Sequence, residues 1–384
     1  MDFVAENRLE LLTSGEQYFP ALMAAIDAAS EDVYLETYIF EDDETGRRVA
    51  NTLCRAAQRG VNVNLLVDGF GARDMALALR EALLAAGVQL LVFRPKISPF
   101  TLRRQRLRRM HRKMAVADGR VAFVSGINII DDANTPGKIP PRHDYAVRVE
   151  GPLVAEVLAQ MEKLWGLVVW ARLRRRWRPE QRVLAAQAAA GTQRAALVIR
   201  DNLHHRADIE EAYLGAIDAA REDIIIANAY FFPGLRFRRA LTNAATRGVR
   251  VTLLLQGRVE YLLLHYASRA LYGSLLAAGV QIHQYTQGFL HAKVAVCDGR
   301  WATVGSSNID PFSLLLAREA NIVVDDRNFA EQLRGSLRQV MEKRAEPVHA
   351  AQWRSQSLLK KMPSWIAYQL VRVLMGLFGY GNQL

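Results

Sequence analysis

The chain carries the same short pattern twice, in HRKMAVADGR at 111–120 and in HAKVAVCDGR at 291–300. Each copy has a histidine, a lysine two residues later and an aspartate five residues after the lysine. An imidazole can act as a nucleophile or as a general acid and base, because its ordinary pKa lies near neutral pH. Two histidines with two lysines suit displacement at a phosphodiester. One histidine would attack phosphorus, the other would handle the proton of the alcohol, and the lysines would stabilise the negative charge.

One copy of so short a pattern can arise by chance, but two copies in register favour a functional site. An asparagine follows ten residues after each aspartate. This chemistry needs no metal or other cofactor, and no Cys/His cluster has the spacing of a zinc site. The candidate catalytic residues are therefore His111, Lys113, Asp118, His291, Lys293 and Asp298, with Asn128 and Asn308 as candidate phosphate ligands.

The two copies belong to a longer internal repeat. RGVNVNLLVDG at 59–69 returns as RGVRVTLLLQG at 247–257, and LLAAGVQL at 83–90 returns as LLAAGVQI at 275–282. The segments keep their order, so we predict a tandem duplication. The offset falls from 192 to 180 residues before the first histidine, which places 12 additional residues in an arginine-rich stretch of the first half. We expect a basic loop there that binds an anionic substrate or a membrane surface.

Buried strands and amphipathic helices alternate within each half. Runs such as VYLETYIF and VNLLVDG are almost continuously apolar, whereas GRRVANTLCRAAQRG has apolar residues three and four apart and ends at glycine. We predict an α/β fold of two similar lobes, with mixed, largely parallel sheets flanked by helices. Side chains alternate along a strand, so His111 and Lys113 share one face. A pseudo-twofold relation of the lobes would place the site at their interface.

The predicted organisation has four parts. They are a first lobe with the basic insertion at 1–175, a linker at 176–198, a second lobe at 199–346 and an amphipathic membrane-associating segment at 347–384. Within the last part, SWIAYQLVRVLMGLFGYG is too short to span a bilayer and is interrupted by arginine, as in interfacial helices. Packing against its own domain is the alternative. The net charge of +11 favours polyanions in general, namely nucleic acid, anionic lipid or a phosphorylated substrate.

HRKMAVADGRVAFVSGIN and HAKVAVCDGRWATVGSSN resemble the paired HKD motifs of the phospholipase D superfamily. The resemblance implies a two-lobed α/β fold and a covalent phosphohistidine. It also implies roles for the motif residues: His111 as nucleophile and His291 as acid and base, Lys113, Lys293, Asn128, Asn308 and Ser306 around the phosphate, and Asp118 and Asp298 as charge partners that organise the motif. Symmetry leaves the choice of nucleophile open. The first copy has Ser125-Gly126 where the second has Gly305-Ser306, which puts a hydroxyl contact with phosphate in doubt there.

Two further carboxylates align between the halves. DYAVRVEG at 144–151 aligns with EANIVVDD at 319–326, so Asp144 corresponds to Glu319. A carboxylate that orients a histidine and fixes its tautomer would serve this chemistry. The alternative is a pair of surface acids at the starts of two strands.

Within the superfamily the chain resembles bacterial cardiolipin synthases of the shorter type, which lack N-terminal membrane-spanning helices. ETYIFEDDETGR at 36–47, RHDYAVRVEGP at 142–152 and NAYFFPG at 228–234 carry this resemblance. The implied reaction transfers a phosphatidyl group from one phosphatidylglycerol to another, which gives cardiolipin and glycerol. The implied partners are anionic phospholipids (phosphatidylglycerol and cardiolipin) and the membrane surface, at the cytoplasmic face of the bacterial inner membrane.

Three alternatives stay open. The donor could be phosphatidylethanolamine, the chain could be a nuclease of the same superfamily, or it could be a catalytically silent lipid-binding protein of the membrane surface. We expect no nucleic-acid partner, because such nucleases often carry one motif per chain and because the tryptophans favour lipid. The sequence leaves the oligomeric state open.

Overall fold

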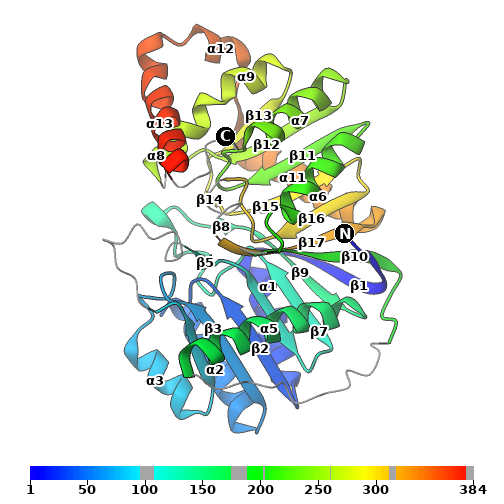
Figure 1. The fold of residues 1–384 in the computed structure, drawn as a ribbon, viewed down its shortest axis with the longest axis vertical. Helices are drawn as coiled ribbons and strands as arrows, with labels where there is room; N and C mark the ends of the chain where they lie inside the picture. Colours follow the sequence, from blue (N-terminus) through cyan, green and yellow to red (C-terminus); the bar gives the residue numbers. More distant parts are fainter. Residues whose placement is uncertain (96–107, 174–187, 202–203, 260, 311–316, 378–384) are drawn as a thin grey trace.

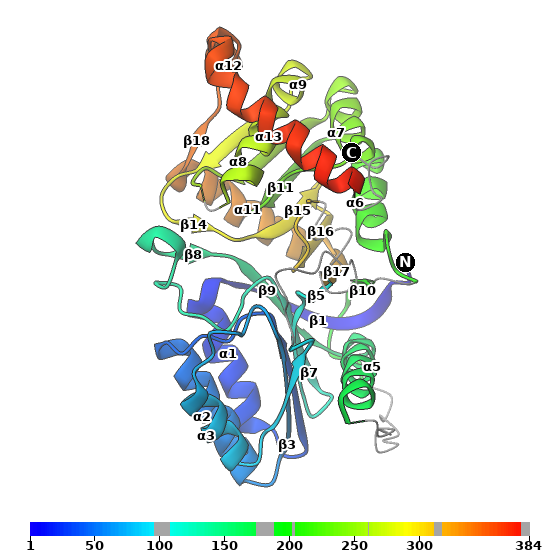
Figure 2. The same ribbon diagram turned by 60° about the vertical axis from the view of Figure 1, so that its left-hand side comes forward.

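The structure is a computed structural model that describes residues 1–95, 108–173, 188–201, 204–259, 261–310 and 317–377. It has two halves of similar construction, one above the other in Figures 1 and 2. The first half contains β1 (Val4–Thr13), α1 (Ser14–Ala28), β2 (Asp32–Thr37), α2 (Glu44–Gln58), β3 (Asn62–Asp68), α3 (Leu77–Ala85), β4 (Gln89–Phe93), β5 (Arg109–Met110), β6 (Lys113–Ala117), β7 (Val121–Ser125), β8 (Arg142–His143), β9 (Tyr145–Glu150) and α5 (Leu153–Leu173). The second half contains β10 (Gln193–Arg200), α6 (Asp208–Ala219), β11 (Asp223–Asn228), α7 (Leu235–Thr246), β12 (Arg250–Gln256), α8 (Leu262–Ala270), α9 (Tyr272–Ala277), β13 (Gln281–Tyr285), β14 (Phe289–Leu290), β15 (Lys293–Cys297), β16 (Trp301–Gly305), β17 (Ala317–Asp325), α11 (Arg327–Arg344), β18 (Ala345–Pro347), α12 (Ala350–Ser355) and α13 (Leu358–Leu377).

The strands of both halves form one hydrogen-bonded series, in the order β18-β13-β12-β11-β15-β16-β17-β10-β1-β9-β7-β6-β2-β3-β4. β1 joins the halves, because its start pairs with β10 and its remainder pairs with β9. The mixed α/β architecture and the duplication are therefore confirmed. The predicted domain boundaries stay predictions. The basic insertion at 96–107 and much of the linker at 176–198 lie outside the described residues.

The predicted dominance of parallel pairing is wrong. Among the strands of this series, the parallel pairs are those of β2-β3-β4 and β11-β12-β13, and the other neighbours are antiparallel. Parallel neighbours need a crossover, which α2 and α3 supply in the first half. β6 and β7 are instead joined by a tight turn at Asp118 and Gly119, both with positive φ, and this turn permits only an antiparallel hairpin.

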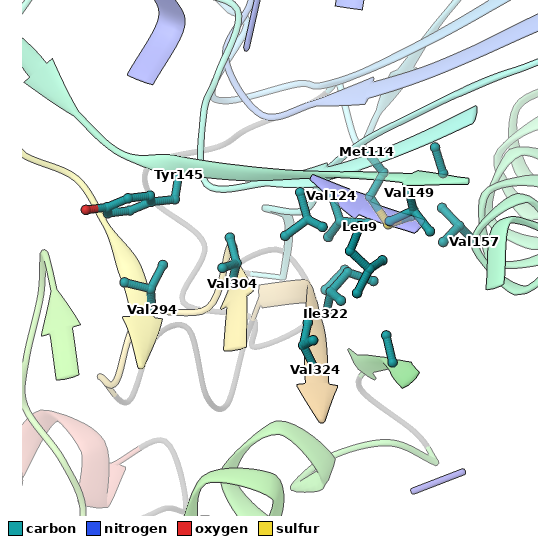
Figure 3. Packing of buried hydrophobic residues seen from close by; sticks show 14 of the residues in the cluster. Leu9, Met114, Val124, Tyr145, Val149, Val157, Val294, Val304, Ile322 and Val324 are labelled. Carbon is teal, nitrogen blue, oxygen red and sulfur yellow. The ribbon is translucent and has the colours of Figure 1, made fainter. Parts of the chain in front are cut away.

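The inner faces of the two halves share one hydrophobic core. Figure 3 shows Leu9, Val124 and Val149 of the first half facing Val304 and Ile322 of the second. All of these side chains are buried, and the transfer of each from water into the core stabilises the folded state by about 1.5–3 kcal/mol. The helices α5 and α11 extend this core, while α1 and α2 cover the outer face of the first sheet and α6 and α7 that of the second. The shared core fixes the relative orientation of the two motif copies.

The C-terminal helix α13 packs along α8 (Figure 2). Its side chains Ala367, Val371 and Met375 are buried in the core of the second half, so part of the predicted amphipathic segment packs against its own domain. None of the helices described is both long and apolar enough to cross a membrane.

Candidate active site

Each motif histidine is anchored on the other half of the chain. β5 pairs in parallel with β17, and the amide N–H of His111 donates to the carbonyl oxygen of Arg318 at 2.9 Å. In the same way β14 pairs with β8, and the N–H of His291 donates to the carbonyl oxygen of His143 at 2.8 Å. These short strands lie between the lobes in Figure 1. The exchange of strands brings the two motifs together at the lobe interface.

The same exchange gives each histidine a carboxylate from the other repeat. Nδ1 of His111 lies 3.0 and 3.1 Å from the two carboxylate oxygens of Glu319, and Nδ1 of His291 lies 2.6 Å from Oδ2 of Asp144. Both carboxylates are buried. An acceptor at Nδ1 places the proton of the neutral imidazole there, which leaves the lone pair on Nε2 for chemistry.

Both imidazoles line one pocket of about 760 Å³, a volume typical of small-molecule sites. Asn128 and Asn308 line it from the two halves, and the amide oxygen of Asn128 accepts a hydrogen bond from the N–H of Ile39 at 3.1 Å. Much of the remaining wall is apolar or aromatic. Its other members are Tyr38, Ile39, Arg109, Ile130, Asn134, Thr135, Pro136, Arg142, Tyr230, Tyr261, Leu263, Leu264, Asp310 and Ala317.

The two lysines are buried beside the histidines. Nζ of Lys113 donates to the carbonyl oxygen of His111 at 2.6 Å and lies 5.4 Å from the centre of the Tyr38 ring. Nζ of Lys293 lies 2.8 Å from Nδ1 of His291 and 3.4 Å from Oδ2 of Asp144. Burial lowers the pKa of Lys113 to about 7 and that of Lys293 to about 8, although nearby carboxylates oppose the shift. A bound phosphodiester would favour the charged form of both lysines.

These lysine pKa values predict the basic limb of the pH profile. In the free enzyme the charge of the two lysines is present below about pH 7 and is lost as the pH rises through about 8. We therefore expect kcat/KM to fall above neutral pH, with apparent pKa values that belong to the pair. The basic limb of the kcat profile should lie at higher pH, because the negative charge of the bound phosphate raises the pKa of both lysines. A kcat/KM that stays flat from pH 7 to about 9 would contradict the lysine role.

The environments of the two histidines differ in charge and in exposure. Burial lowers the pKa of His111, and the neighbouring Glu319 carboxylate opposes this shift. Burial lowers the pKa of His291 further, and the positive charges of Lys293 and Arg142 add to the effect. The His111 side chain is also twice as exposed, at 16% against 8%. Lys113 lowers the pKa of His111 as well, but the shift of His291 is larger, so these differences support the proposal that His111 is the nucleophile.

Asp118 and Asp298 lie away from the pocket, at the far ends of β6 and β15. The Asp118 carboxylate accepts the backbone N–H groups of Ser30, Glu31 and Asp32 at 2.8–3.0 Å. Asp298 accepts the corresponding amides of the second half at 2.8–3.0 Å. Asp118 and Asp298 are therefore not part of the pocket wall with His111 and His291, and we no longer group them with the catalytic residues. They form the hairpin turn and tie it to the loop before the first parallel strand, which agrees with the expected organising role.

Ser306 orients a carboxylate instead of lining the pocket. Its hydroxyl is buried and donates to Oε2 of Glu319 at 2.6 Å, so the proposed contact with phosphate is not what the geometry shows. In the first half Gly126 occupies the corresponding position. A Cβ there would lie 2.5 Å from the Asp144 carboxylate oxygens, which explains why no serine stands at this point. The two repeats therefore hold their carboxylates by different means.

Several pocket residues were missed by the sequence reasoning. Arg142 stands two residues before Asp144, but the aligned position of the second half is Ala317, so a search for repeated residues does not find it. Arg109 corresponds in the same way to Phe289. Arg112, at the end of the arginine-rich stretch, forms a buried ion pair with Glu36 and so is not part of a solvated loop. Among the described residues, none of the His, Cys, Asp and Glu clusters is suited to a metal ion.

Comparison with known proteins identifies the family. The model of the family "Cardiolipin synthase, PLD-like domain" matches residues 22–165 and 213–341, so each match contains one motif copy. The chain is 40% identical to cardiolipin synthase B of Escherichia coli K12 over 375 residues, 97% of this chain and 90% of that protein. It is 34% identical to a cardiolipin synthase of Geobacillus kaustophilus over 316 residues, 82% of this chain and 62% of that protein.

The fold has a solved counterpart in the phosphatidylserine synthase of Haemophilus influenzae. The two superpose with a TM-score of 0.72 at 12% sequence identity, over 97% of this chain and 95% of that chain. At this identity the likeness supports the fold alone. The family match and the full-length similarity carry the assignment: the chain belongs to the cardiolipin synthase family of phospholipase D-like proteins.

Proposed function

We propose that the protein synthesises cardiolipin from two molecules of phosphatidylglycerol through a phosphohistidine. The observation that carries this proposal is the pair of carboxylate-bound imidazoles, one from each repeat, in the wall of one pocket. In the first step Nε2 of His111 attacks phosphorus, the P–O bond to glycerol breaks, and the glycerol oxygen takes a proton from His291. The negative charge of the phosphodiester raises the pKa of His291 toward the range in which it can hold that proton.

The second step reverses the proton transfer. The headgroup hydroxyl of a second phosphatidylglycerol gives its proton to His291 and its oxygen bonds to phosphorus, while the P–N bond to His111 breaks. Lys113, Lys293, Asn128 and Asn308 are proposed to hold the phosphate oxygens during both steps. Water must compete poorly for transfer to prevail, and the apolar part of the wall, with Ile130, Leu263 and Leu264, supports exclusion of water. This wall also favours a lipid over a nucleic acid.

A surface beside the pocket suits a membrane. Along α13 the exposed apolar side chains recur every three or four residues, opposite the stripe that packs on α8. They are Leu359, Met362, Ile366, Leu370 and Val373, with Trp365 beside them. Tyr261 and Leu262, at the start of α8 next to the pocket, are also exposed. Lys360 and Arg372 flank the stripe, and the net charge of +11 attracts anionic lipid. We propose that this surface docks the enzyme peripherally on the cytoplasmic face of the inner membrane.

Replacement of Trp365 and Ile366 by alanine tests the docking surface. Each loses a large apolar side chain that is more than half exposed, so we expect vesicle binding to fall about tenfold or more. Co-sedimentation with phosphatidylglycerol vesicles measures the effect. The matched control replaces Leu167 and Trp170 of α5, which are exposed to a similar extent, at 50% and 53%. Equal losses in both double variants would show that this surface has no special role.

Vesicles of defined headgroup test the reaction itself. Purified enzyme on vesicles of phosphatidylglycerol alone should give cardiolipin and glycerol in equal amounts by mass spectrometry. Formation of cardiolipin only when phosphatidylethanolamine is present would make that lipid the donor. Strand cleavage of nucleic acid with no turnover of any lipid would favour the nuclease, and binding to vesicles without turnover in either assay would favour the silent protein.

A further inference from the structure

One cation beside His291 is not repeated at the aligned position of the other half. Arg142 lines the pocket, and the position that corresponds to it by repeat alignment is Ala317. Its guanidinium donates to the carbonyl oxygen of Asn134 at 2.7 Å and lies 5.0 Å from the centre of the Phe289 ring. That ring in turn stacks on the His291 imidazole, with centroids 6.1 Å apart. The arginine is therefore held in a fixed place next to the acid and base of the reaction.

Backbone pairing ties this arginine to the same histidine. Arg142 and His143 form β8, which pairs with Phe289 and Leu290 of β14, and the carbonyl oxygen of His143 accepts the His291 N–H. The positive charge of Arg142 lowers the pKa of His291, which places the two groups within electrostatic reach. Asp132 is a nearby acid whose pKa burial raises to about 6, so it is mostly ionised at neutral pH and offsets part of the Arg142 charge. Of these two groups Arg142 lines the pocket and Asp132 does not.

The proposed reaction brings two phosphodiesters into this pocket. The lysines and asparagines serve the phosphate that reacts, but the acceptor lipid carries a second phosphate three carbons from its attacking hydroxyl. That hydroxyl must approach His291, because His291 takes its proton. We propose, resting on the proposed function, that Arg142 binds the phosphate of the acceptor phospholipid and makes the enzyme selective for an anionic acceptor. Arginine suits this task because its planar donors match a phosphate in a bidentate manner.

Arg109, which lines the same pocket beside His111, provides a comparison. Arg109 precedes His111, lies 3.9 Å from the buried carboxylate of Asp68 and stacks on Phe70 at 5.3 Å. It is on the side of the nucleophile, and Asp68 partly balances its charge. Arg109 is therefore expected to affect formation of the phosphohistidine and not the choice of acceptor.

Competition between two acceptors tests the proposal. Enzyme on phosphatidylglycerol vesicles with added ethanol forms cardiolipin and phosphatidylethanol from one common phosphohistidine. The ratio of these products reports the acceptor step alone and does not depend on how much enzyme is folded. We expect Arg142→Gln to lower the ratio of cardiolipin to phosphatidylethanol about tenfold or more, and Arg142→Lys, which keeps the charge but not the bidentate donors, to recover only part of it. Arg109→Gln should lower total turnover and leave the ratio within about twofold of wild type.

Two results would overturn the inference. An unchanged ratio in Arg142→Gln would show that its charge does not select the acceptor, and an equal fall in Arg109→Gln would show that the effect is one of general charge. Failure of the proposed function is distinguishable from both. A wild-type enzyme that forms phosphatidylethanol but no cardiolipin would refute the synthase reaction, and the assignment of Arg142 with it.

Discussion

Replacement of His111 by asparagine is expected to abolish cardiolipin synthesis, with a loss on the order of 10⁴–10⁶ in kcat. The loss should be this large because asparagine cannot form the P–N bond that the mechanism assigns to Nε2 of His111, while His291, which Asp144 orients as Glu319 orients His111, is assigned to proton transfer. The phosphohistidine should be absent as well. Rapid quench with lipid labelled in its phosphate, followed by alkaline isolation of the labelled protein, measures the intermediate directly.

The His291→Asn enzyme provides the contrasting measurement. It lacks the acid for the leaving alcohol but keeps the nucleophile, so a phosphatidyl ester of nitrophenol should still label it, because nitrophenolate leaves without a proton. The label should then persist, since no base activates the acceptor. Labelling of the His111→Asn enzyme at His291 would reverse the assignment of the two histidines. Substantial cardiolipin synthesis by His111→Asn would remove the covalent role of His111, and substantial synthesis by His291→Asn would remove the role of His291 as acid and base.

The duplicated pattern allowed the main features of the site to be predicted, because each repeat carries its histidine, lysine and asparagine in register. The sequence does not show which groups contact one another across the lobe interface. His111 contacts Glu319 and His291 contacts Asp144 because β5 and β14 each cross to pair with the other half. Strand exchange cannot be predicted from local hydrophobic periodicity, because the side chains of a strand alternate in the same way whether it pairs within its own half or with the other half.

The departures from the expected structure have equally physical origins. The aspartate of each motif recurs with the histidine and lysine because both hairpins need the same turn and the same acceptor for backbone N–H groups, and it lies outside the pocket wall. The apolar strands predicted parallel pairing, but burial on both faces also occurs when sheets of two lobes pack on one another, as β9 and β16 do here. The place of Arg142 in the pocket wall cannot be predicted from the repeat, because the aligned residue of the second half is Ala317.

Removal of the charge of Glu319 or Asp144 should produce the second largest loss of kcat. In Glu319→Gln and Asp144→Asn the amide can donate its own N–H to Nδ1, which moves the imidazole proton to Nε2 and withdraws the lone pair from the pocket. A comparable change of aspartate to asparagine in serine proteases lowers kcat about 10⁴-fold, and we expect about 10³–10⁴ here. Glu319→Gln should suppress formation of the phosphohistidine, whereas Asp144→Asn should mainly slow its transfer to the acceptor.

The pH profile separates these positioning roles from simple damage to the fold. The Asp144 carboxylate raises the pKa of Lys293, so the neutral amide of Asp144→Asn should lower that pKa below about 8 and move the basic limb of kcat/KM to lower pH. Asp118→Asn is the matched control, because it changes a motif carboxylate that lies outside the pocket wall. It should lower the melting temperature and leave kcat within about threefold of wild type. A limb that does not move in Asp144→Asn, or a loss in Asp118→Asn as large as that in Glu319→Gln, would mean that these carboxylates act through the stability of the lobes and not through the tautomers of the histidines.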